Sequence, residues 1–313
     1  MAQTETVALA DRSRTGGIDA WFTYHLSYKA PDLIGPVLCA RLSLPYILAE
    51  ASLAPKRARG LWSLQHRMVE QAVRMADHIL FLNPADEACV LPALKAGAGY
   101  SRLPPFLANS CASTPCERCP NRLAWASRLD IPADRPWILA VGMMRPGDKL
   151  MSYRSLAHSA KCLTSASAIL ILVGDGEART EVRAAFADCP LPVVLAGALE
   201  GDDLQSLRVS ADIHAWPAVG EAVGMATLES MAAGLAVVTG RQGAIARVVV
   251  DGETGLLAPT AEDMTAALRR LIDMPDLRRT LGRAARQQAV TNHSLQAAAM
   301  HLDRVLRGVV AKR

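Results

Sequence analysis

The sequence has no uninterrupted apolar run of the roughly 18 residues that a membrane-spanning helix needs. Its first residues, MAQTETVALADRSRTGG, contain no basic stretch followed by an apolar one, so they do not resemble a secretory signal peptide. Neither sign of charge dominates, because the 313 residues carry a net charge of only +4 and the positive residues are scattered. These absences argue against a membrane-spanning protein and against a nucleic-acid-binding surface.

The sequence is not poor in cysteine, but nothing in it predicts disulfide bonds. Seven cysteines in a chain without a signal peptide indicate reduced thiols, so we expect a cytoplasmic protein. Three of them, Cys111, Cys116 and Cys119, lie in the segment CASTPCERCP. A C-x2-C pair is typical of zinc sites, but no nearby histidine supplies a fourth ligand, and Cys89 is the closest outside candidate. We expect reduced thiols here, no metal and no cofactor, and leave the role of these cysteines open.

Short apolar segments alternate with helical ones along most of the remaining sequence. Hydrophobic residues make up 51% of the chain and charged residues 20%, which is enough core material for two domains of medium size. Strands that alternate with helices predict parallel sheets and an α/β fold. We place the first domain at residues 1–133 and the second at residues 134–291. The first has three expected strands, at residues 18–24, 44–49 and 78–83, and the second has about six.

The segment from Asp212 to Gly240 organises the second domain. The apolar runs at its two ends, DIHAWP and LAVVTG, predict buried strands. The residues from Met225 to Ala233 lack Pro and Gly and predict a helix, and Gly234 stands where a left-handed residue commonly ends one. In a parallel sheet the connection from strand to helix lies at the carboxyl end, where ligands bind. Free amides at the helix N-terminus favour an anion such as phosphate.

Two carboxylates lie eight residues apart in this segment. Glu221 is in the connection, where the helix N-terminus stabilises an anion, whereas Glu229 falls near the middle of the helix among Ala, Leu and Met. A buried carboxylate is costly without a partner, and the hydroxyl groups of a ligand are natural partners. Two interpretations of Glu229 stay open: a ligand-binding residue and a helix residue that faces solvent.

These residues resemble the E-x7-E signature of the retaining family-4 glycosyltransferases, which are group 1 enzymes with the GT-B fold of two Rossmann-like domains. The family signature reads roughly P-S-x-x-E-G-F-G-x-x-x-L-E-A-M-A-x-G-x-P-V-V. Residues 250–257, VDGETGLL, are also similar to the family's V-x-D-G-x-T-G-L-L. The positions that match the first signature are Pro217, Glu221, Gly224, Leu228, Glu229, Met231, Ala232, Gly234, Val237 and Val238.

The resemblance implies a role for each residue of this segment that faces the donor. Glu221 would contact the donor sugar, and Glu229 would hold the ribose hydroxyls of the nucleotide. The backbone amides around Val223 and Gly224 would hold the diphosphate. By the same resemblance, the last helix, at about residues 292–313, would pack back on the first domain.

Two further turns complete the expected donor site. The turn from Gly142 to Lys149 stands where the family has G-R-L-x-x-x-K-G, so Arg145 and Lys149 would supply cations for the diphosphate. Ordinary surface cations are the alternative for both residues. The turn that begins at Gly174, with the sequence GDGE, resembles the family's V-G-D-G turn.

The resemblance implies an acceptor-side domain that is incomplete. His25 matches the end of the family's D-x-x-x-x-x-H strand and is our acceptor-side candidate. Ala51 stands where the family usually carries a histidine, and two or three β-α units that the family places before this region are missing. Lys56, Arg57 and Arg59 form a basic patch, either a solvated loop or a contact for an anionic acceptor or a phospholipid surface.

We therefore predict a glycosyltransferase of the hexosyltransferase type. It would move a sugar from a UDP- or GDP-sugar to a glycan or lipid-linked acceptor with retention, in the synthesis of cell-envelope polysaccharide. The catalytic candidates are Glu221, Lys149 and Arg145. The expected location is cytoplasmic, with peripheral contact at the inner face of the membrane left open. A nucleotide-sugar-binding protein with little or no turnover is the alternative, and the E-x7-E spacing disfavours a third candidate, a sugar epimerase.

Overall fold

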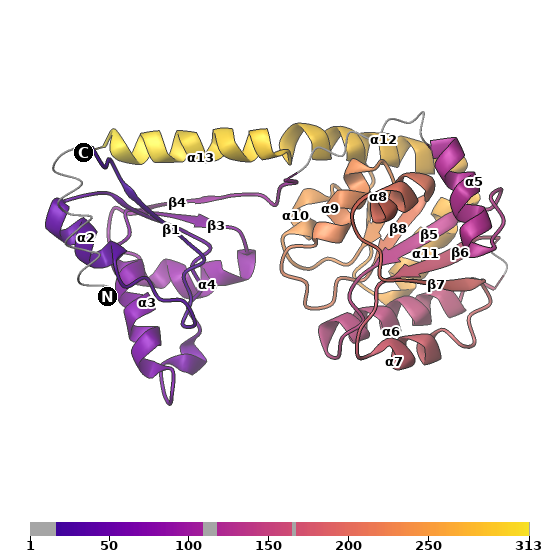
Figure 1. Cartoon of the computed structure of the whole chain (residues 1–313), viewed down its shortest axis with the longest axis horizontal. Helices are drawn as coiled ribbons and strands as arrows, with labels where there is room; N and C mark the ends of the chain where they lie inside the picture. Colours follow the sequence, from indigo (N-terminus) through magenta and orange to yellow (C-terminus); the bar gives the residue numbers. More distant parts are fainter. Residues whose placement is uncertain (1–16, 109–117, 165–166, 313) are drawn as a thin grey trace. The chain divides into compact units, whose positions relative to one another are not determined.

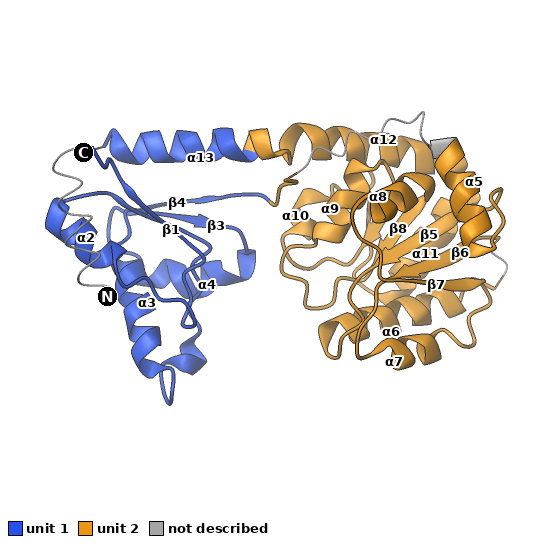
Figure 2. Cartoon of the chain, in the orientation of Figure 1, with its two compact units in different colours: residues 1–104, 298–313 blue, residues 105–297 orange. Residues whose placement is uncertain are grey.

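A computed structural model of the chain describes residues 17–108, 118–164 and 167–312. The chain consists of two compact units (Figures 1 and 2). Unit 1 comprises residues 1–104 and 298–313, and unit 2 comprises residues 105–297. Cys111 and Cys116 lie outside the described residues, as does the side chain of Cys119, so the prediction for these cysteines stays a prediction.

Unit 1 is built on a parallel sheet with the strand order β1-β2-β3-β4. The strands are β1 (Trp21–Tyr24), β2 (Tyr46–Ala49), β3 (His78–Phe81) and β4 (Gly99–Arg102). Three of them fall within the expected ranges, and β4 is a strand that the sequence did not predict. The apolar runs of β2 and β3 are buried, whereas β4, with the sequence GYSR, alternates between half-buried and exposed residues, as an outer strand can.

Within the described residues of unit 1 the helices are α2 (Gly35–Leu42), α3 (Ser63–Met75) and the short α4 (Glu87–Val90), with 3-10 turns η1 (Pro55–Arg57), η2 (Pro84–Asp86) and η3 (Leu91–Ala93). The helical segment at residues 84–93 is divided into three short pieces, because Pro84 and Pro92 each favour a short 3-10 turn. Residues 298–310 of the last helix, α13 (Leu295–Val310), belong to this unit. Figure 1 shows α13 on the side of the sheet opposite to α2, α3 and α4.

Unit 2 is built on a six-stranded parallel sheet with the strand order β10-β9-β8-β5-β6-β7. Two β-α-β halves meet between β5 and β8, where the strand order reverses, and loops diverge at such a point to leave room for a ligand. Figure 1 shows helices on both faces of the sheet. The strands are β5 (Trp137–Val141), β6 (Ile169–Val173), β7 (Val193–Gly197), β8 (Ile213–Trp216), β9 (Ala236–Thr239) and β10 (Leu256–Leu257).

The two faces of this sheet bury separate cores. One core joins strand residues such as Ile138 and Leu170 to α6 (Asp148–Lys161), α7 (Arg179–Ala185) and α11 (Ala261–Asp273). The alternate strand residues, such as Leu139 and Ile171, pack against α5 (Arg118–Leu129) and α8 (Gly201–Ser210). This alternation is the expected result of the two-residue period of a strand. The remaining helices are α9 (Met225–Ala232), α10 (Ile245–Val248) and α12 (Pro275–Asn292).

The boundary between the units lies earlier than the predicted one at residues 133 and 134. Unit 2 begins at Pro105 and includes α5, because α5 packs against α8. Arg122 of α5 forms an ion pair with Asp212 at 3.0 Å, and the indole of Trp125 donates a hydrogen bond to Ser206 at 2.9 Å. These partners lie more than 80 residues away along the chain, so the sequence did not reveal the attachment.

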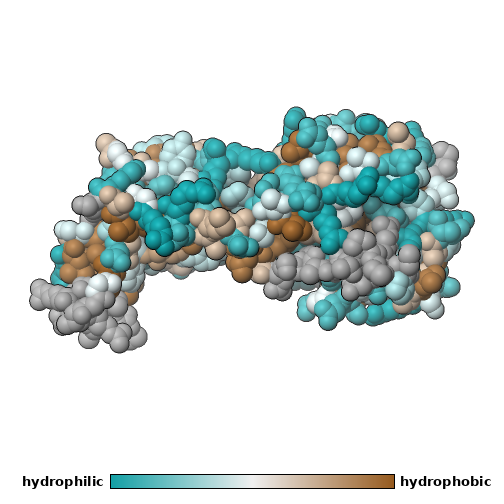
Figure 3. All heavy atoms as spheres, turned by 90° about the horizontal axis from the view of Figure 1, so that it is seen from above, coloured by the Kyte–Doolittle hydropathy of each residue, from teal (hydrophilic) through white to brown (hydrophobic). Residues whose placement is uncertain are grey.

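The face shown in Figure 3 is mostly hydrophilic, with hydrophobic residues in small, separate groups. Among the helices within the described residues, none is long and apolar enough to cross a membrane.

Candidate active site

The candidate site begins where β5 and β6 end side by side. The N–H of Gly142 donates to the carbonyl of Val173 at 3.0 Å, and the hydroxyl of Tyr153 donates to the carbonyl of Gly142 at 2.6 Å. Gly174 has a φ of +144°, and a Cβ there would lie 1.9 Å from the Gly142 carbonyl oxygen. Only glycine fits such a position. The predicted residues Gly142 and Gly174 therefore allow two strand ends to approach closely at the carboxyl edge of the sheet.

Lys149 and Glu221 form an ion pair at this edge. Lys149 lies in the first turn of α6 and Glu221 in the connection from β8 to α9, and Nζ is 2.5 Å from Oε2. Their side chains are only 18% and 17% exposed. Partial shielding from water strengthens such a pair. The structure thus brings together two of the three predicted catalytic residues.

Trp216 is a third member of this cluster, and the sequence did not identify it. It ends β8, and its indole N–H donates to Oε2 of Glu221 at 3.2 Å. Lys149 Nζ lies 5.2 Å from the centroid of the indole ring, within the range of a cation–π contact. Trp216 therefore orients both charged side chains.

The connection that carries Glu221 is held in place by hydrogen bonds from its own backbone. Val219 N–H donates to the hydroxyl of Ser152 at 3.0 Å, and Gly220 N–H donates to the side-chain oxygen of Gln242 at 2.9 Å. Ala218 has a φ of +57°, which costs a non-glycine residue energy and persists only when the surroundings impose it. The backbone on the N-terminal side of Glu221 is therefore fixed by its contacts with neighbouring segments.

The same connection ends at the N-terminus of α9. Gly224 precedes the helix with a φ of +84°, and a Cβ there would lie 2.6 Å from Cβ of Ile245. Within the described part of the chain, the N–H groups of Val223 and Gly224 donate no hydrogen bond. Open amides at a helix N-terminus favour an anion, as predicted for these two residues.

Glu229 is part of an ion pair on the next helical turn. Its carboxylate contacts the guanidinium of Arg208 of α8, whose side chain is only 7% exposed, while the Glu229 side chain is 33% exposed. A buried cation therefore holds the carboxylate, and both interpretations of Glu229 stay predictions. The exposed third of the side chain is available to a ligand.

His214 of β8 holds α9 against the sheet. It is fully buried in β8, and its two ring nitrogens lie 3.1 Å from the hydroxyls of Thr227 and Ser230 on α9. Burial, and secondly the positive charge of Arg208, lower the pKa of His214 from 6.5 to about 3. The imidazole is therefore neutral at physiological pH and serves as a structural hydrogen-bonding residue.

Arg145, the third catalytic candidate, is not joined to the Lys149–Glu221 pair. It is exposed in the turn after β5 and forms no hydrogen bond or ion pair with the described residues. The backbone of that turn is fixed, because the N–H of Met144 donates to the carbonyl of Asp175 and its carbonyl accepts from the N–H of Ala178, at 2.8 Å each. The side chain of Arg145 is therefore a free cation on an ordered loop.

His25, the acceptor-side candidate, lies in unit 1. Its Nδ1 is 3.2 Å from the carboxylate of Glu50, and the two side chains are 59% and 27% exposed. The two residues follow the carboxyl ends of β1 and β2 and have positive φ angles of 61° and 56°. Such backbone conformations are uncommon for these residue types and concentrate at functional sites. Ala51, next to Glu50, is completely buried.

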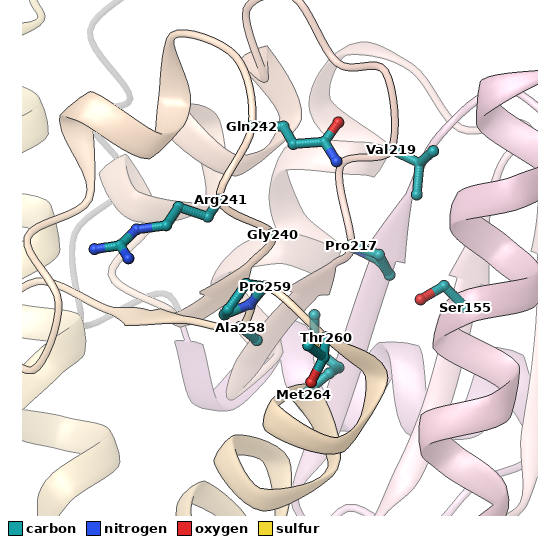
Figure 4. A pocket seen from close by; sticks show the side chains of 10 residues that line it. All are labelled: Ser155, Pro217, Val219, Gly240, Arg241, Gln242, Ala258, Pro259, Thr260 and Met264. Atoms are coloured by element: carbon teal, nitrogen blue, oxygen red, sulfur yellow. The ribbon is translucent and has the colours of Figure 1, made fainter.

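A cavity of about 130 Å³ lies at the carboxyl ends of β8, β9 and β10 (Figure 4). It is smaller than the roughly 300–1,000 Å³ of typical ligand pockets. None of the predicted site residues lines it, and Figure 4 shows the guanidinium of Arg241 extending away from the other lining residues. We therefore do not assign the donor to it. The lining residues are Ser155, Pro217, Val219, Gly240, Arg241, Gln242, Ala258, Pro259, Thr260 and Met264.

Comparison with known proteins assigns this part of the chain. Residues 135–274 match the family model described as Glycosyl transferases group 1. The match includes Lys149, Glu221 and Glu229 and covers most of unit 2.

Curated relatives match mainly over the same region. A sulfoquinovosyl transferase of Arabidopsis thaliana is 29% identical over 160 residues, which are 50% of this chain and 30% of that protein. A D-inositol 3-phosphate glycosyltransferase of Saccharomonospora viridis is 40% identical over 91 residues, which are 28% of this chain and 21% of that protein. The matched segments thus span less than a third of the length of these two relatives.

Solved structures resemble the chain over nearly its whole length. A glycosyltransferase from Rickettsia africae has a TM-score of 0.74 at 14% identity, and the match covers 99% of this chain and 81% of that chain. The Anabaena protein HepE, solved in complex with UDP, has a TM-score of 0.72 at 14% identity, with 97% and 82% covered. A sucrose-phosphate synthase from Thermosynechococcus elongatus has a TM-score of 0.68 at 18% identity, with 100% and 79% covered. The chain therefore has the GT-B-like α/β fold.

Proposed function

We propose that the chain is a retaining family-4 glycosyltransferase that moves a hexose from a UDP- or GDP-sugar to a glycan or lipid-linked acceptor. The observation that carries the proposal is the Lys149–Glu221 pair, held by Trp216 where the strand order of the unit 2 sheet reverses. A cation, a carboxylate and an open helix N-terminus meet the needs of a sugar diphosphate. HepE, which shares the fold, has been solved with UDP and with UDP-glucose, and this supports the choice of donor.

In the proposed reaction the bond between the anomeric carbon and the phosphate oxygen breaks, and its electron pair leaves with the diphosphate. The acceptor hydroxyl bonds to the same face of the carbon, and its proton passes to the departing diphosphate oxygen. Lys149 and the amides of Val223 and Gly224 would neutralise the charge that develops on the departing oxygen. Arg145 is the second cation that we assign to the diphosphate, because it is exposed on an ordered loop. The proposal assigns no metal ion, since these groups supply the positive charge.

The two carboxylates would recognise the rest of the donor. Glu221 would accept hydrogen bonds from hydroxyls of the sugar, and Glu229 from the ribose, through the part of its side chain that Arg208 leaves exposed. His25, with Glu50 beside it, is the acceptor-side candidate in unit 1. The proposal places the protein in the cytoplasm, in the synthesis of cell-envelope polysaccharide, with peripheral contact at the inner face of the membrane.

A nucleotide-sugar-binding protein with little or no turnover is a second candidate, because of the strand order of unit 1. The described strands follow one another as β1-β2-β3-β4, without the reversal that unit 2 has. Open parallel sheets usually hold their ligands at such a reversal. A unit without it offers fewer positions at which an acceptor can be held.

Turnover with candidate donors distinguishes the two functions. The 313-residue chain is incubated with UDP- and GDP-hexoses, with and without a membrane extract as the source of acceptor, and nucleotide release is measured. The enzyme predicts release that depends on the extract, and a product with the anomeric configuration of the donor by NMR. The binding protein predicts donor binding by calorimetry, with release no greater than that of Glu221→Gln. Absence of both binding and release would reject both functions.

A further inference from the structure

A second surface, in unit 1, shares no residue with the candidate active site. The loop before α3 and the first turn of that helix carry Leu61, Trp62 and Leu64, which are 96%, 37% and 57% exposed. A single exposed leucine is ordinary, but three large apolar side chains within four residues form a patch, and such patches mark interaction sites. None of the three belongs to the buried cluster that forms the core of unit 1.

Cations surround this patch. Between Glu50 and Glu70 the sequence has no acidic residue. Within that segment Lys56, Arg59 and Arg67 are exposed, and Arg57 is half-buried. The segment therefore carries charge of one sign only.

An aromatic pair joins the cations to the apolar side chains. The ring of Tyr28 packs edge-on against Trp62, with the ring centroids 5.2 Å apart. The guanidinium of Arg57 lies 5.0 Å from the Tyr28 centroid, and Lys29 Nζ lies 6.0 Å from it. The next acidic residue after Lys29 is Asp32, whose carboxylate accepts hydrogen bonds from the hydroxyls of Thr23 and Tyr46 at 2.5 and 2.8 Å. We call the group the Trp62 surface: Tyr28, Lys29, Lys56, Arg57, Arg59, Leu61, Trp62, Leu64 and Arg67.

The combination of residues fits a membrane interface. In proteins that lie on a bilayer, apolar side chains enter the boundary between headgroups and acyl chains, and Trp sits at the level of the headgroups. Lys and Arg beside them are attracted to anionic lipids. A nucleic acid would use the cations but leave the 96% exposed Leu61 without a partner. A second copy of this surface would be repelled, because both copies carry only positive charge.

We propose that the Trp62 surface docks unit 1 on an anionic lipid bilayer. Leu61, Trp62 and Leu64 enter the headgroup boundary, and the surrounding cations meet lipid phosphates. α3 and α13 lie on opposite sides of the unit 1 sheet in Figure 1, so docking through the start of α3 leaves α13 uncovered. The inference rests on the peripheral membrane contact of the proposed function and gives it a surface and a lipid class. It needs no donor or acceptor.

Flotation with vesicles of phosphatidylcholine, with and without phosphatidylglycerol, tests the proposal. The full chain should float with the anionic vesicles and remain behind with phosphatidylcholine alone. Arg59→Gln should weaken binding about fivefold, which is the contribution of one cation near an anionic surface. Arg304→Gln on α13, also an exposed arginine, is the matched control and should bind like the wild type.

The apolar contribution is tested separately from charge. Leu61→Ser combined with Leu64→Ser should weaken binding about tenfold, and the loss should persist at high salt because it comes from burial of apolar surface. Leu123→Ser in α5 of unit 2, where Leu123 is 65% exposed, is the matched control. Thermal unfolding shows whether each variant is folded. Neither the unfolding nor the flotation measurement needs a nucleotide, so the vesicle result does not depend on whether the donor site binds UDP.

Each of the following results would overturn the proposal. Equal binding to both kinds of vesicle, or binding to neither, would show that the surface does not recognise anionic lipid. Vesicle binding as strong as that of the wild type in the double leucine variant would show that the apolar side chains do not contribute. Binding of an oligonucleotide by that variant would indicate that the basic residues contact nucleic acid instead. A dimer that the leucine variant dissociates, measured by light scattering, would assign the surface to a second copy of the chain.

Discussion

Nζ of Lys149 lies 2.5 Å from Oε2 of Glu221, so the cation assigned to the donor diphosphate and the carboxylate assigned to the donor sugar are paired with each other. Trp216 donates a hydrogen bond to the same oxygen. A diphosphate that binds Lys149 must therefore compete with Glu221. The two residues are coupled in any binding measurement, and each substitution changes the state of the other.

Glu221→Gln separates recognition of the nucleotide from recognition of the sugar. The substitution removes the negative charge that competes for Lys149, so UDP or GDP alone should bind as tightly as to the wild type or up to about tenfold more tightly. The sugar nucleotide should lose any advantage over the free nucleotide, because the amide is a weaker acceptor for sugar hydroxyls. Calorimetry with both ligands measures this. Tenfold weaker binding of UDP itself would contradict the assignment of Glu221 to the sugar.

Glu229→Ala should reduce both nucleotide affinity and stability. Loss of hydrogen bonds to a charged group weakens UDP or GDP binding by about 1–3 kcal/mol. The substitution also leaves the buried Arg208 without its carboxylate, which should lower the free energy of unfolding by about 1–2 kcal/mol. This is less than for a fully buried pair, because a third of Glu229 is exposed. Urea unfolding and calorimetry measure the two effects.

The matched control for Glu229 is Asp303→Ala in α13. Asp303 pairs with Arg307 at 2.8 Å, and both side chains are more than half exposed. Exposed pairs contribute less than about 1 kcal/mol, so this variant should bind nucleotide normally and unfold like the wild type. Unchanged nucleotide binding by Glu229→Ala would show that its assigned role is wrong.

His214 gives the stability of unit 2 a defined pH dependence. Its pKa of about 3 in the folded chain is below the ordinary value of 6.5, so the unfolded chain binds one more proton between these pH values. The free energy of unfolding therefore rises with pH across this window, by at most about 1.4 kcal/mol per pH unit, and the contribution is complete above it. Urea unfolding of the wild type between about pH 4 and 6.5 should show a steeper dependence than that of His214→Gln. Parallel curves for the two proteins would contradict this origin.

Gly174→Ala should disrupt the strand ends below the site. The new Cβ would lie 1.9 Å from the carbonyl oxygen of Gly142, and the backbone angle there is unfavourable for alanine. We expect the free energy of unfolding to fall by about 3 kcal/mol or more. Gly308→Ala in α13, where nothing lies within 4 Å, should instead raise it by about 0.5–1 kcal/mol. Thermal or urea unfolding checks both, and a Gly174→Ala protein as stable as the wild type would contradict the close approach of β5 and β6.

The central unit of the fold could be predicted because local causes determine each of its parts. β8 and β9 are apolar runs with turn residues beside them, and α9 occupies a stretch of good helix formers that ends before Gly234. The strand β4 was not predicted, because its sequence GYSR has one apolar residue. It forms a strand through its pairing with β3, which the sequence does not show. Helix α6 begins at Asp148, directly after Gly147, which ends the preceding turn with a φ of +85°.

The partners within the candidate site could not be predicted in the same way. The resemblance named Lys149 and Glu221 separately, but their contact joins residues 72 positions apart. Arg208 and His214 gave no local pattern, since their importance depends on how α8 and β8 pack against α9. Trp216 had one indication, its place at the carboxyl end of the strand before Glu221, where ligands approach a parallel sheet.

Calorimetric titration of the chain with UDP and GDP, compared with Lys149→Met, tests the central claim most directly. Met keeps an apolar stem over Trp216 and removes the charge. The account predicts that the wild type binds at least one of the two nucleotides and that Lys149→Met binds it about 10- to 100-fold more weakly, as for the loss of a charged hydrogen bond. A folded Lys149→Met protein with the affinity of the wild type, or a folded wild type that binds neither nucleotide, would contradict a donor site at the Lys149–Glu221 pair.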